Sequence, residues 1–185
     1  MFSEVFCQPK LRQVAPDIYA TPFLTEEYCE RVLWALEQEG TWSPSCSRYP
    51  TQDIHLKNDL PYYYEEMDEH LFYSIWPLIQ QEWNISDIEL TDMFAVKYTL
   101  DGQKKLKLHH DKSYVTGSIK LNNDYDGAEL KFPRQDFSNI NIPVGDMIIW
   151  PSQITHPHHC SEPVSYTHLR AHETLRYLVC RLLLE

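Results

Sequence analysis

The sequence lacks the marks of several protein classes. Its five cysteines are odd in number and scattered, at Cys7, Cys29, Cys46, Cys160 and Cys180, with no Cys-x-x-Cys pair among them. We therefore expect free thiols in a reducing, cytoplasmic location rather than a disulfide framework or a structural zinc site. No uninterrupted apolar run reaches the length of a membrane span, and the first residues lack the basic start and apolar core of a signal peptide. A membrane partner is not expected.

An excess of basic side chains is also lacking. The chain has 16 lysines and arginines against 27 aspartates and glutamates, a formal net charge of −11. Nucleic-acid binding depends on cationic side chains that displace counterions, so we expect no nucleic-acid partner. The negative charge would suit a basic peptide as well as it would serve solubility. No internal repeat, low-complexity tract or linker divides the 185 residues, a length that suits one domain.

Helical signals are confined to the first half of the chain. Thr25, followed by two glutamates, predicts the start of a helix, and Gly40 predicts its end. Pro61 suits the first turn of a second helical region that runs towards Trp83. Pro77 lies inside that region and should kink or break it.

Short segments typical of strands follow. They are residues 51–56, 93–98, 114–121, 129–132 and 146–150, with turns expected at 122–124, 126–127 and 144–145. Helices first and many short strands afterwards predict a mainly β fold with supporting helices. We expect a double-stranded β-helix, or jelly-roll, barrel with helices at its N-terminal side.

The residues most suggestive of chemistry are His109 and Asp111. On a strand, residues two apart point to the same face, so both could bind one metal while His110 points away. A histidine from a distant strand would complete a set of two histidines and one carboxylate. Residues 155–159 contain three candidates. That ligand set is typical of non-heme Fe(II) oxygenases, because it leaves coordination positions open.

The span 51–162 resembles the catalytic domain of procollagen-lysine 5-dioxygenases, within the prolyl-4-hydroxylase-like class of 2-oxoglutarate- and Fe(II)-dependent oxygenases. A His-x-Asp motif alone is a weak signal, but here it stands in an ordered set of matching segments. These are residues 53–56, 96–98, 106–111, 121–123, 124–130 and 145–158.

The resemblance implies roles for the histidines. His109 and Asp111 match the first two iron ligands. The family's spacing places the third ligand at His158, with His159 as the alternative. His156 is a third candidate, interpreted as a residue near the site or on the surface.

Four further residues carry expectations. His55 matches a family position but is interpreted as a packed structural histidine, and His70 as a surface or packing residue. Tyr98 matches a tyrosine that lines the cosubstrate pocket, with a half-buried barrel tyrosine as the alternative. Lys120 is a candidate to bind the 5-carboxylate of 2-oxoglutarate, with a solvated strand lysine as the alternative.

The implied activity is hydroxylation of a side chain, such as a peptidyl lysine or proline, coupled to oxidative decarboxylation of 2-oxoglutarate to succinate and CO₂. Fe(II), 2-oxoglutarate and O₂ are the implied cofactor and cosubstrates, and ascorbate is a further candidate. Two alternatives stay open: a small-molecule hydroxylase on the same fold, and a metal-binding barrel without turnover.

Residues 164–185 differ in character and resemble translated sequencing-library adapter. We therefore expect a dioxygenase domain over 1–163 whose last native strand is missing; a genuine closing segment is the alternative. In the family an arginine after the distal histidine binds the 5-carboxylate. That position falls at His168 or Leu169, and we interpret the nearness of Arg170 as coincidence.

Overall fold

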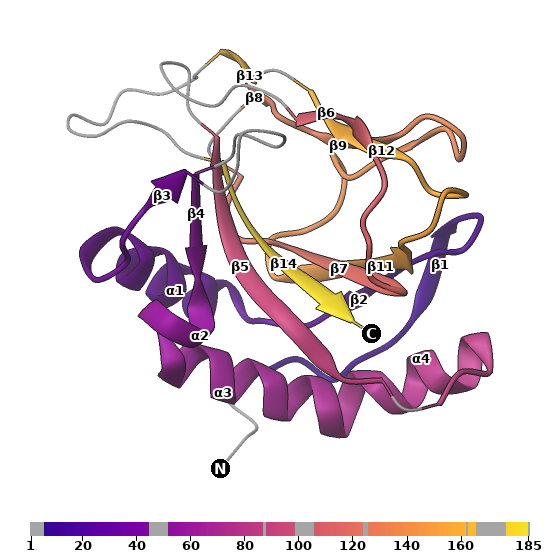
Figure 1. Ribbon diagram of the computed structural model, residues 1–185, viewed down its shortest axis with the longest axis horizontal. Helices are drawn as coiled ribbons and strands as arrows, with labels where there is room; N and C mark the ends of the chain where they lie inside the picture. The colour runs from indigo at the N-terminus through magenta and orange to yellow at the C-terminus, as the bar shows by residue number, and fades with distance from the viewer. Residues whose placement is uncertain are drawn as a thin grey trace.

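The computed structural model describes residues 6–44, 52–86, 88–98, 106–123, 126–161, 163–165 and 177–184. A large sheet and a small sheet face each other, and helices cover the outer face of the large one (Figure 1). The prediction of a mainly β fold with N-terminal supporting helices is confirmed. Within the described ranges, every helix is too short or too polar to cross a membrane.

All strand pairs in the three sheets are antiparallel. The large sheet has eight strands in the order β1 (Arg12–Ala15), β2 (Ile18–Pro22), β11 (Asp146–Pro151), β7 (Val115–Lys120), β14 (Tyr177–Leu184), β5 (Leu90–Tyr98), β4 (Gln52–His55) and β3 (Ser43–Pro44). The small sheet has the order β10 (Phe137–Ser138), β9 (Leu130–Phe132), β12 (His158–Cys160) and β6 (Leu106–His109). β13 (Pro163–Ser165) and β8 (Asp126–Gly127) form a separate pair.

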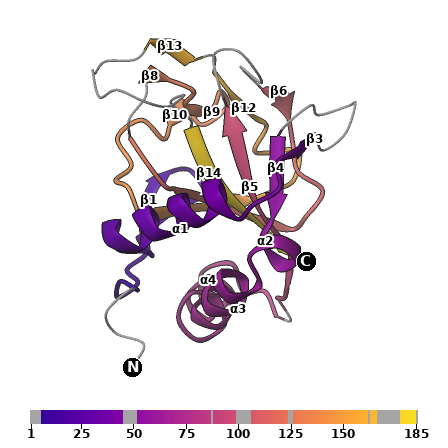
Figure 2. The ribbon, with the colours of Figure 1, turned by 90° about the vertical axis from the view of Figure 1, so that its left-hand side faces the viewer.

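The helices follow the sequence signals closely. α1 (Glu26–Gln38) begins as expected, because the Thr25 hydroxyl accepts the backbone N–H of Tyr28 at 3.2 Å. After the short α2 (Leu56–Asp59), the second helical region consists of α3 (Pro61–His70), a π turn η1 (Leu71–Ile75) and α4 (Trp76–Trp83). Pro77 lies in the first turn of α4, where its missing N–H costs little, and the widened turn precedes it. Figure 2 shows α3 and α4 end-on, beside the sheet that α1 also covers.

The large sheet separates two apolar clusters. Ile119 and Ile149 face the helices and belong to the core that includes α1, α3 and α4. Ile148 and Trp150 alternate with them along β11 and pack against Phe132 of the small sheet. Since neighbouring strand residues point to opposite faces, the interior between the sheets is distinct from the helix-side core.

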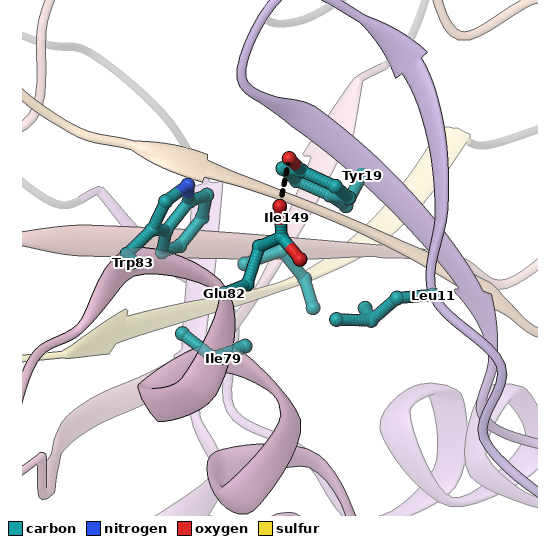
Figure 3. Close-up of a pocket in the computed structure, with 6 residues that line it drawn as sticks. All are labelled: Leu11, Tyr19, Ile79, Glu82, Trp83 and Ile149. Atoms are coloured by element: carbon teal, nitrogen blue, oxygen red, sulfur yellow. Dashed lines mark hydrogen bonds between the residues drawn. The ribbon is translucent and has the colours of Figure 1, made fainter.

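A narrow crevice lies on the helix side (Figure 3). It is too narrow to hold a water molecule and is lined by Leu11, Tyr19, Ile79, Glu82, Trp83 and Ile149. The Tyr19 hydroxyl donates to Glu82 at 2.5 Å, and this bond raises the pKa of Tyr19 to about 12. Because Ile149 and Trp150 point to opposite faces, the crevice lies across the sheet from the interior that Trp150 lines. It is a contact between β2 and α4.

The predicted turn at 144–145 is confirmed and needs its glycine. Gly145 has a φ of +83°, and its N–H donates to the carbonyl of Lys120 at 2.8 Å. Its own carbonyl accepts the N–H groups of Phe23 and Leu24. A Cβ at this position would lie 2.1 Å from the carbonyl oxygen of Leu24, so a side chain has no room.

Two segments differ from expectation. Residues 126–127 were predicted as a turn, yet they form β8, in which Gly127 has a φ of +80° and pairs with Pro163. The hairpin of β1 and β2 lies in a segment for which the sequence predicted no hairpin. Both elements are short. β8 pairs with a segment that is distant in the sequence, and β1 pairs with β2 across a tight turn.

Residues 177–184, which were set aside from the fold, form β14. Its backbone pairs with both β5 and β7, with Tyr177 opposite Tyr98 and Val179 opposite Lys120. β14 therefore occupies the place of a closing strand in the large sheet. That residues 164–185 are not native stays a prediction.

Candidate metal centre

Three side chains meet between the sheets. His109 ends β6, Asp111 lies in the bend that follows, and His158 begins β12. The antiparallel register of β6 and β12 places His158 opposite His109, with ring centroids 4.4 Å apart. One ligand-type atom from each of the three residues lies within 4.8 Å of the others.

The carboxylate of Asp111 lies between the two imidazoles. Its Oδ1 is 3.5 Å from Nε2 of His109 and its Oδ2 is 3.4 Å from Nε2 of His158. Metal–ligand bonds of about 2.1 Å at right angles separate adjacent donor atoms by about 3 Å. A small contraction would therefore bring the three groups to coordination distance. The donor types and their spacing fit a divalent transition metal.

Each imidazole is held by its other nitrogen. Nδ1 of His109 lies 2.8 Å from the carbonyl oxygen of Lys107, and Nδ1 of His158 lies 3.1 Å from that of His156. A carbonyl oxygen can only accept, so Nδ1 carries the hydrogen and Nε2 presents its lone pair. This tautomer is the one that a metal ligand requires.

The site is enclosed. The side chain of His109 is 8% exposed, that of Asp111 10% and that of His158 0%. The His158 ring packs against Phe132 at 5.3 Å and Trp150 at 5.2 Å. Burial of the carboxylate, which is screened little by solvent, strengthens its attraction for a cation.

The expected geometry was wrong in one respect, because Asp111 does not lie on the same strand as His109. β6 ends at His109, and Asp111 belongs to the bend between β6 and β7. Its carboxylate is held instead by the Thr116 hydroxyl, which donates to Oδ2 at 2.9 Å. Sequence reasoning missed Thr116, whose only signal was a polar residue in a strand that proved to be buried throughout.

The structure distinguishes the three histidines of the second cluster. His159 is adjacent to His158 on β12, so it points to the other face, and its register partner is Lys131. His156 is 2% exposed and its Nε2 lies 3.2 Å from the carbonyl oxygen of Pro16. In the part of the chain that the structure describes, the one group with metal-ligand spacing includes His158 and neither of these.

Two further histidines, His55 and His70, lie outside this group. His55 packs through one ring contact, with the ring of Phe94 at 5.8 Å. Its side chain is 43% exposed at the junction of β4 and α2, and its Nδ1 lies 3.1 Å from Oδ1 of Asp92. For His70 the packing alternative is confirmed. It is 9% exposed, its ring stacks on Phe6 at 4.2 Å, and burial lowers its pKa to about 4.

Tyr98 and Lys120 both lie inside the molecule. Tyr98 is 3% exposed and packs with Leu106 and Cys160 of the small sheet, so it is more buried than the alternative interpretation allowed. Lys120 is 4% exposed, which rules out a solvated strand lysine. It lies on the same face of β7 as Thr116, because the two are four residues apart.

The ammonium group of Lys120 has defined contacts. It donates to the carbonyl oxygens of Ile140 and Ile142, both at 3.1 Å. Burial lowers the pKa of Lys120.

No protein-family model matches the chain. Among solved structures, the viral collagen prolyl hydroxylase vCPH from Paramecium Bursaria Chlorella virus-1, in its 2-oxoglutarate complex, aligns with a TM-score of 0.61. The alignment covers 93% of this chain and 98% of that one, at 11% sequence identity. The chain thus has the fold of the prolyl 4-hydroxylase-like 2-oxoglutarate–Fe(II) oxygenases.

Relatives found by sequence point to one group of these oxygenases. The multifunctional procollagen lysine hydroxylase and glycosyltransferase LH3 of Rattus norvegicus is 30% identical over 80% of this chain. The procollagen-lysine,2-oxoglutarate 5-dioxygenase 2 of Homo sapiens is 28% identical over 85% of it. The resemblance is therefore confirmed: the chain is homologous to one segment of the procollagen lysine hydroxylases. It spans 22% and 23% of the length of these two relatives.

Proposed function

We propose that the chain is the catalytic core of an Fe(II)- and 2-oxoglutarate-dependent dioxygenase that hydroxylates a side chain. The observation that carries this proposal is the convergence of His109, Asp111 and His158, with both Nε2 atoms turned towards the carboxylate. Three ligands on one side of a metal leave the other positions for a cosubstrate and O₂.

The residues of the site have separate tasks in this proposal. The two imidazoles and the carboxylate would hold iron, and Phe132 and Trp150 would exclude water beside His158. When bound, iron with 2-oxoglutarate and O₂ supplies the chemistry that yields succinate, CO₂ and a substrate in which one C–H has become C–OH. The protein's part is to fix the ligands and enclose the reaction.

We assign Tyr98 and Lys120 to the cosubstrate pocket. Both are buried between the sheets, and a buried cation next to an anionic ligand gains more than an exposed one. If Lys120 binds the 5-carboxylate, Lys120→Met lowers 2-oxoglutarate affinity about tenfold while Co(II) affinity stays unchanged. Calorimetry of both ligands measures this. Equal 2-oxoglutarate affinity in the variant would show that Lys120 only anchors the carbonyls of Ile140 and Ile142.

A peptidyl lysine or proline is the proposed substrate. Its support is that the relatives are named for procollagen lysine hydroxylation and the structural neighbour for collagen prolyl hydroxylation. The net charge of −11 favours a basic, lysine-containing peptide. Mass spectrometry of collagen-like peptides containing lysine or proline would detect a gained oxygen atom. Succinate formation with unmodified peptides would favour a small-molecule substrate.

Two further assignments belong to the proposal. A reducing, cytoplasmic location belongs to the proposal, and the free thiols of Cys7, Cys29 and Cys160 support it. Ascorbate as an additional cofactor stays a prediction; stimulation of succinate formation by ascorbate would test it.

The function is tested by Fe(II)-dependent formation of succinate at millimolar 2-oxoglutarate. Asp111→Ala removes one ligand and should abolish it. His158→Ala and His159→Ala form a matched pair on β12, and only the first should lose activity. Full activity in Asp111→Ala would contradict the proposal. Metal binding without succinate formation in the unmodified chain would favour a barrel without turnover.

A further inference from the structure

Three buried hydroxyl groups lie next to Asp111. Ser113 belongs to the bend after Asp111, Thr116 to β7, and Ser152 follows β11. They are 4%, 0% and 0% exposed. Their oxygens form a closed group, with Ser113 and Ser152 2.9 Å apart, Ser152 and Thr116 2.5 Å apart, and Ser113 and Thr116 3.1 Å apart.

The number of protons available fixes which hydroxyl donates and which accepts in this group. A hydroxyl has one proton to donate, and an ionised carboxylate can only accept. The Thr116 proton is therefore used on Oδ2 of Asp111, at 2.9 Å. Ser113 donates to Ser152, so Ser152 donates its own proton to Thr116. The result is a directed chain, Ser113 to Ser152 to Thr116 to Asp111, in which each bond polarises the next.

The same group joins the two segments that carry the ligands. Ser152 also donates its backbone N–H to the carbonyl oxygen of Tyr114 at 2.9 Å. Tyr114 lies in the bend that follows Asp111, and Ser152 begins the loop that precedes His158. The bond therefore links the segment of Asp111 to the segment that leads to His158.

We propose, on the basis of the function proposed above, that Thr116 is a positioning residue for the metal. By engaging Oδ2 from the protein side, it fixes the rotation of the Asp111 carboxylate and directs one oxygen to the metal. Ser152 and Ser113 fix Thr116 in turn. Without the Thr116 hydroxyl, Oδ2 loses this donor, so the carboxylate is less constrained before the metal binds.

Co(II) titration of the full chain, followed by calorimetry and by visible absorption, tests the proposal. Thr116→Val keeps the shape and removes the hydroxyl; we expect it to bind Co(II) about 10- to 100-fold more weakly, with an altered spectrum. Thr116→Ser restores the hydroxyl and should recover both. Ser118→Ala is the matched control, since Ser118 is the next residue on the same face of β7 and is also buried. Ser118→Ala should leave the Co(II) affinity and the visible spectrum unchanged.

The outcomes separate this proposal from the proposed function. Native affinity and spectrum in Thr116→Val overturn the positioning role alone. Absence of Co(II) binding in the unmodified chain, or native binding in Asp111→Ala, overturns both proposals. If Thr116→Val does not fold, Ser152→Ala takes its place, because it breaks the chain one step further from the carboxylate. A spectrum and affinity unchanged in Ser152→Ala would then contradict the positioning role.

Discussion

At the scale of the residue, the metal centre depends on which imidazole nitrogen is engaged by the protein. Backbone carbonyls take Nδ1 of both His109 and His158, so the two Nε2 atoms are turned to Asp111 before any metal arrives. Such preorganisation reduces the conformational entropy that the side chains lose when they bind a metal. Each carbonyl belongs to the residue two positions earlier in the chain, so both contacts are local in the sequence.

His70 gives a pH prediction. Burial lowers its pKa from 6.5 to about 4, so the unfolded chain binds more protons than the folded one between these values. Stability from this group is complete above about pH 6.5 and is lost as the pH falls through about 4. The loss is about 3 kcal/mol in total. Urea unfolding of His70→Phe from pH 4 to 7 should show a flatter dependence than the native protein.

The matched control is His55→Phe. It makes the same substitution at a histidine whose side chain is 43% exposed. A slope in His70→Phe equal to the native slope would mean that other groups cause the acid sensitivity.

At the scale of the element, the start of α1 is fixed by its N-cap, Thr25. Thr25 accepts the N–H of Tyr28, and the buried face of the helix, including Val32 and Leu36, packs on the helix-side core. We expect Thr25→Ala to lower the free energy of unfolding by about 1 kcal/mol, because one helix N–H loses its acceptor. Thr25→Ser retains the oxygen and should lose much less. Equal stability of the two variants, measured by urea unfolding, would contradict this role.

The turn before β11 gives a second prediction at this scale. Gly145→Ala places a Cβ 2.1 Å from the Leu24 carbonyl oxygen at a φ of +83°. Strain of this kind costs about 1–3 kcal/mol, and the close contact adds to it. We expect a loss of more than about 2 kcal/mol in stability, visible in thermal unfolding. An unchanged midpoint would show that the loop between β10 and β11 can rearrange freely.

Local signals explain which elements the sequence predicts well. The Thr25 cap, Pro61 and the glycine turn at 145 act within a few residues, and the helices and β11 lie where these signals place them. β14 and the pairing of β8 depend on distant partners. The convergence of His109 with His158 follows from a β6–β12 register that no local pattern contains. Thr116 was missed for a similar reason, since its role depends on where the bend at Asp111 turns.

At the scale of the whole molecule, the large sheet separates the helix-side core from the candidate metal centre. Helices and the core around Ile149 lie on one face, while Trp150, Tyr98, Lys120 and the candidate metal ligands lie on the other. Figure 1 shows the small sheet closing that second face. Substitutions on the helix side should therefore change stability more than cosubstrate binding.

The tail gives a prediction at this scale. If residues 164–185 are not native, the family's arginine is absent, and the 185-residue chain should bind 2-oxoglutarate weakly, with a Kd of about 1 mM or above. Calorimetry measures this directly. Micromolar binding would contradict the prediction, as would a nucleotide sequence that continues without a junction at codon 163.

The central claim is that His109, Asp111 and His158 bind one metal ion. A crystal of the full chain grown with Mn(II) tests it most directly, through the anomalous scattering of the metal. We expect one peak per chain, about 2.0–2.2 Å from Nε2 of both histidines and from a carboxylate oxygen of Asp111. A peak on His159 or His156, or a metal elsewhere with these three side chains unbound, would contradict it.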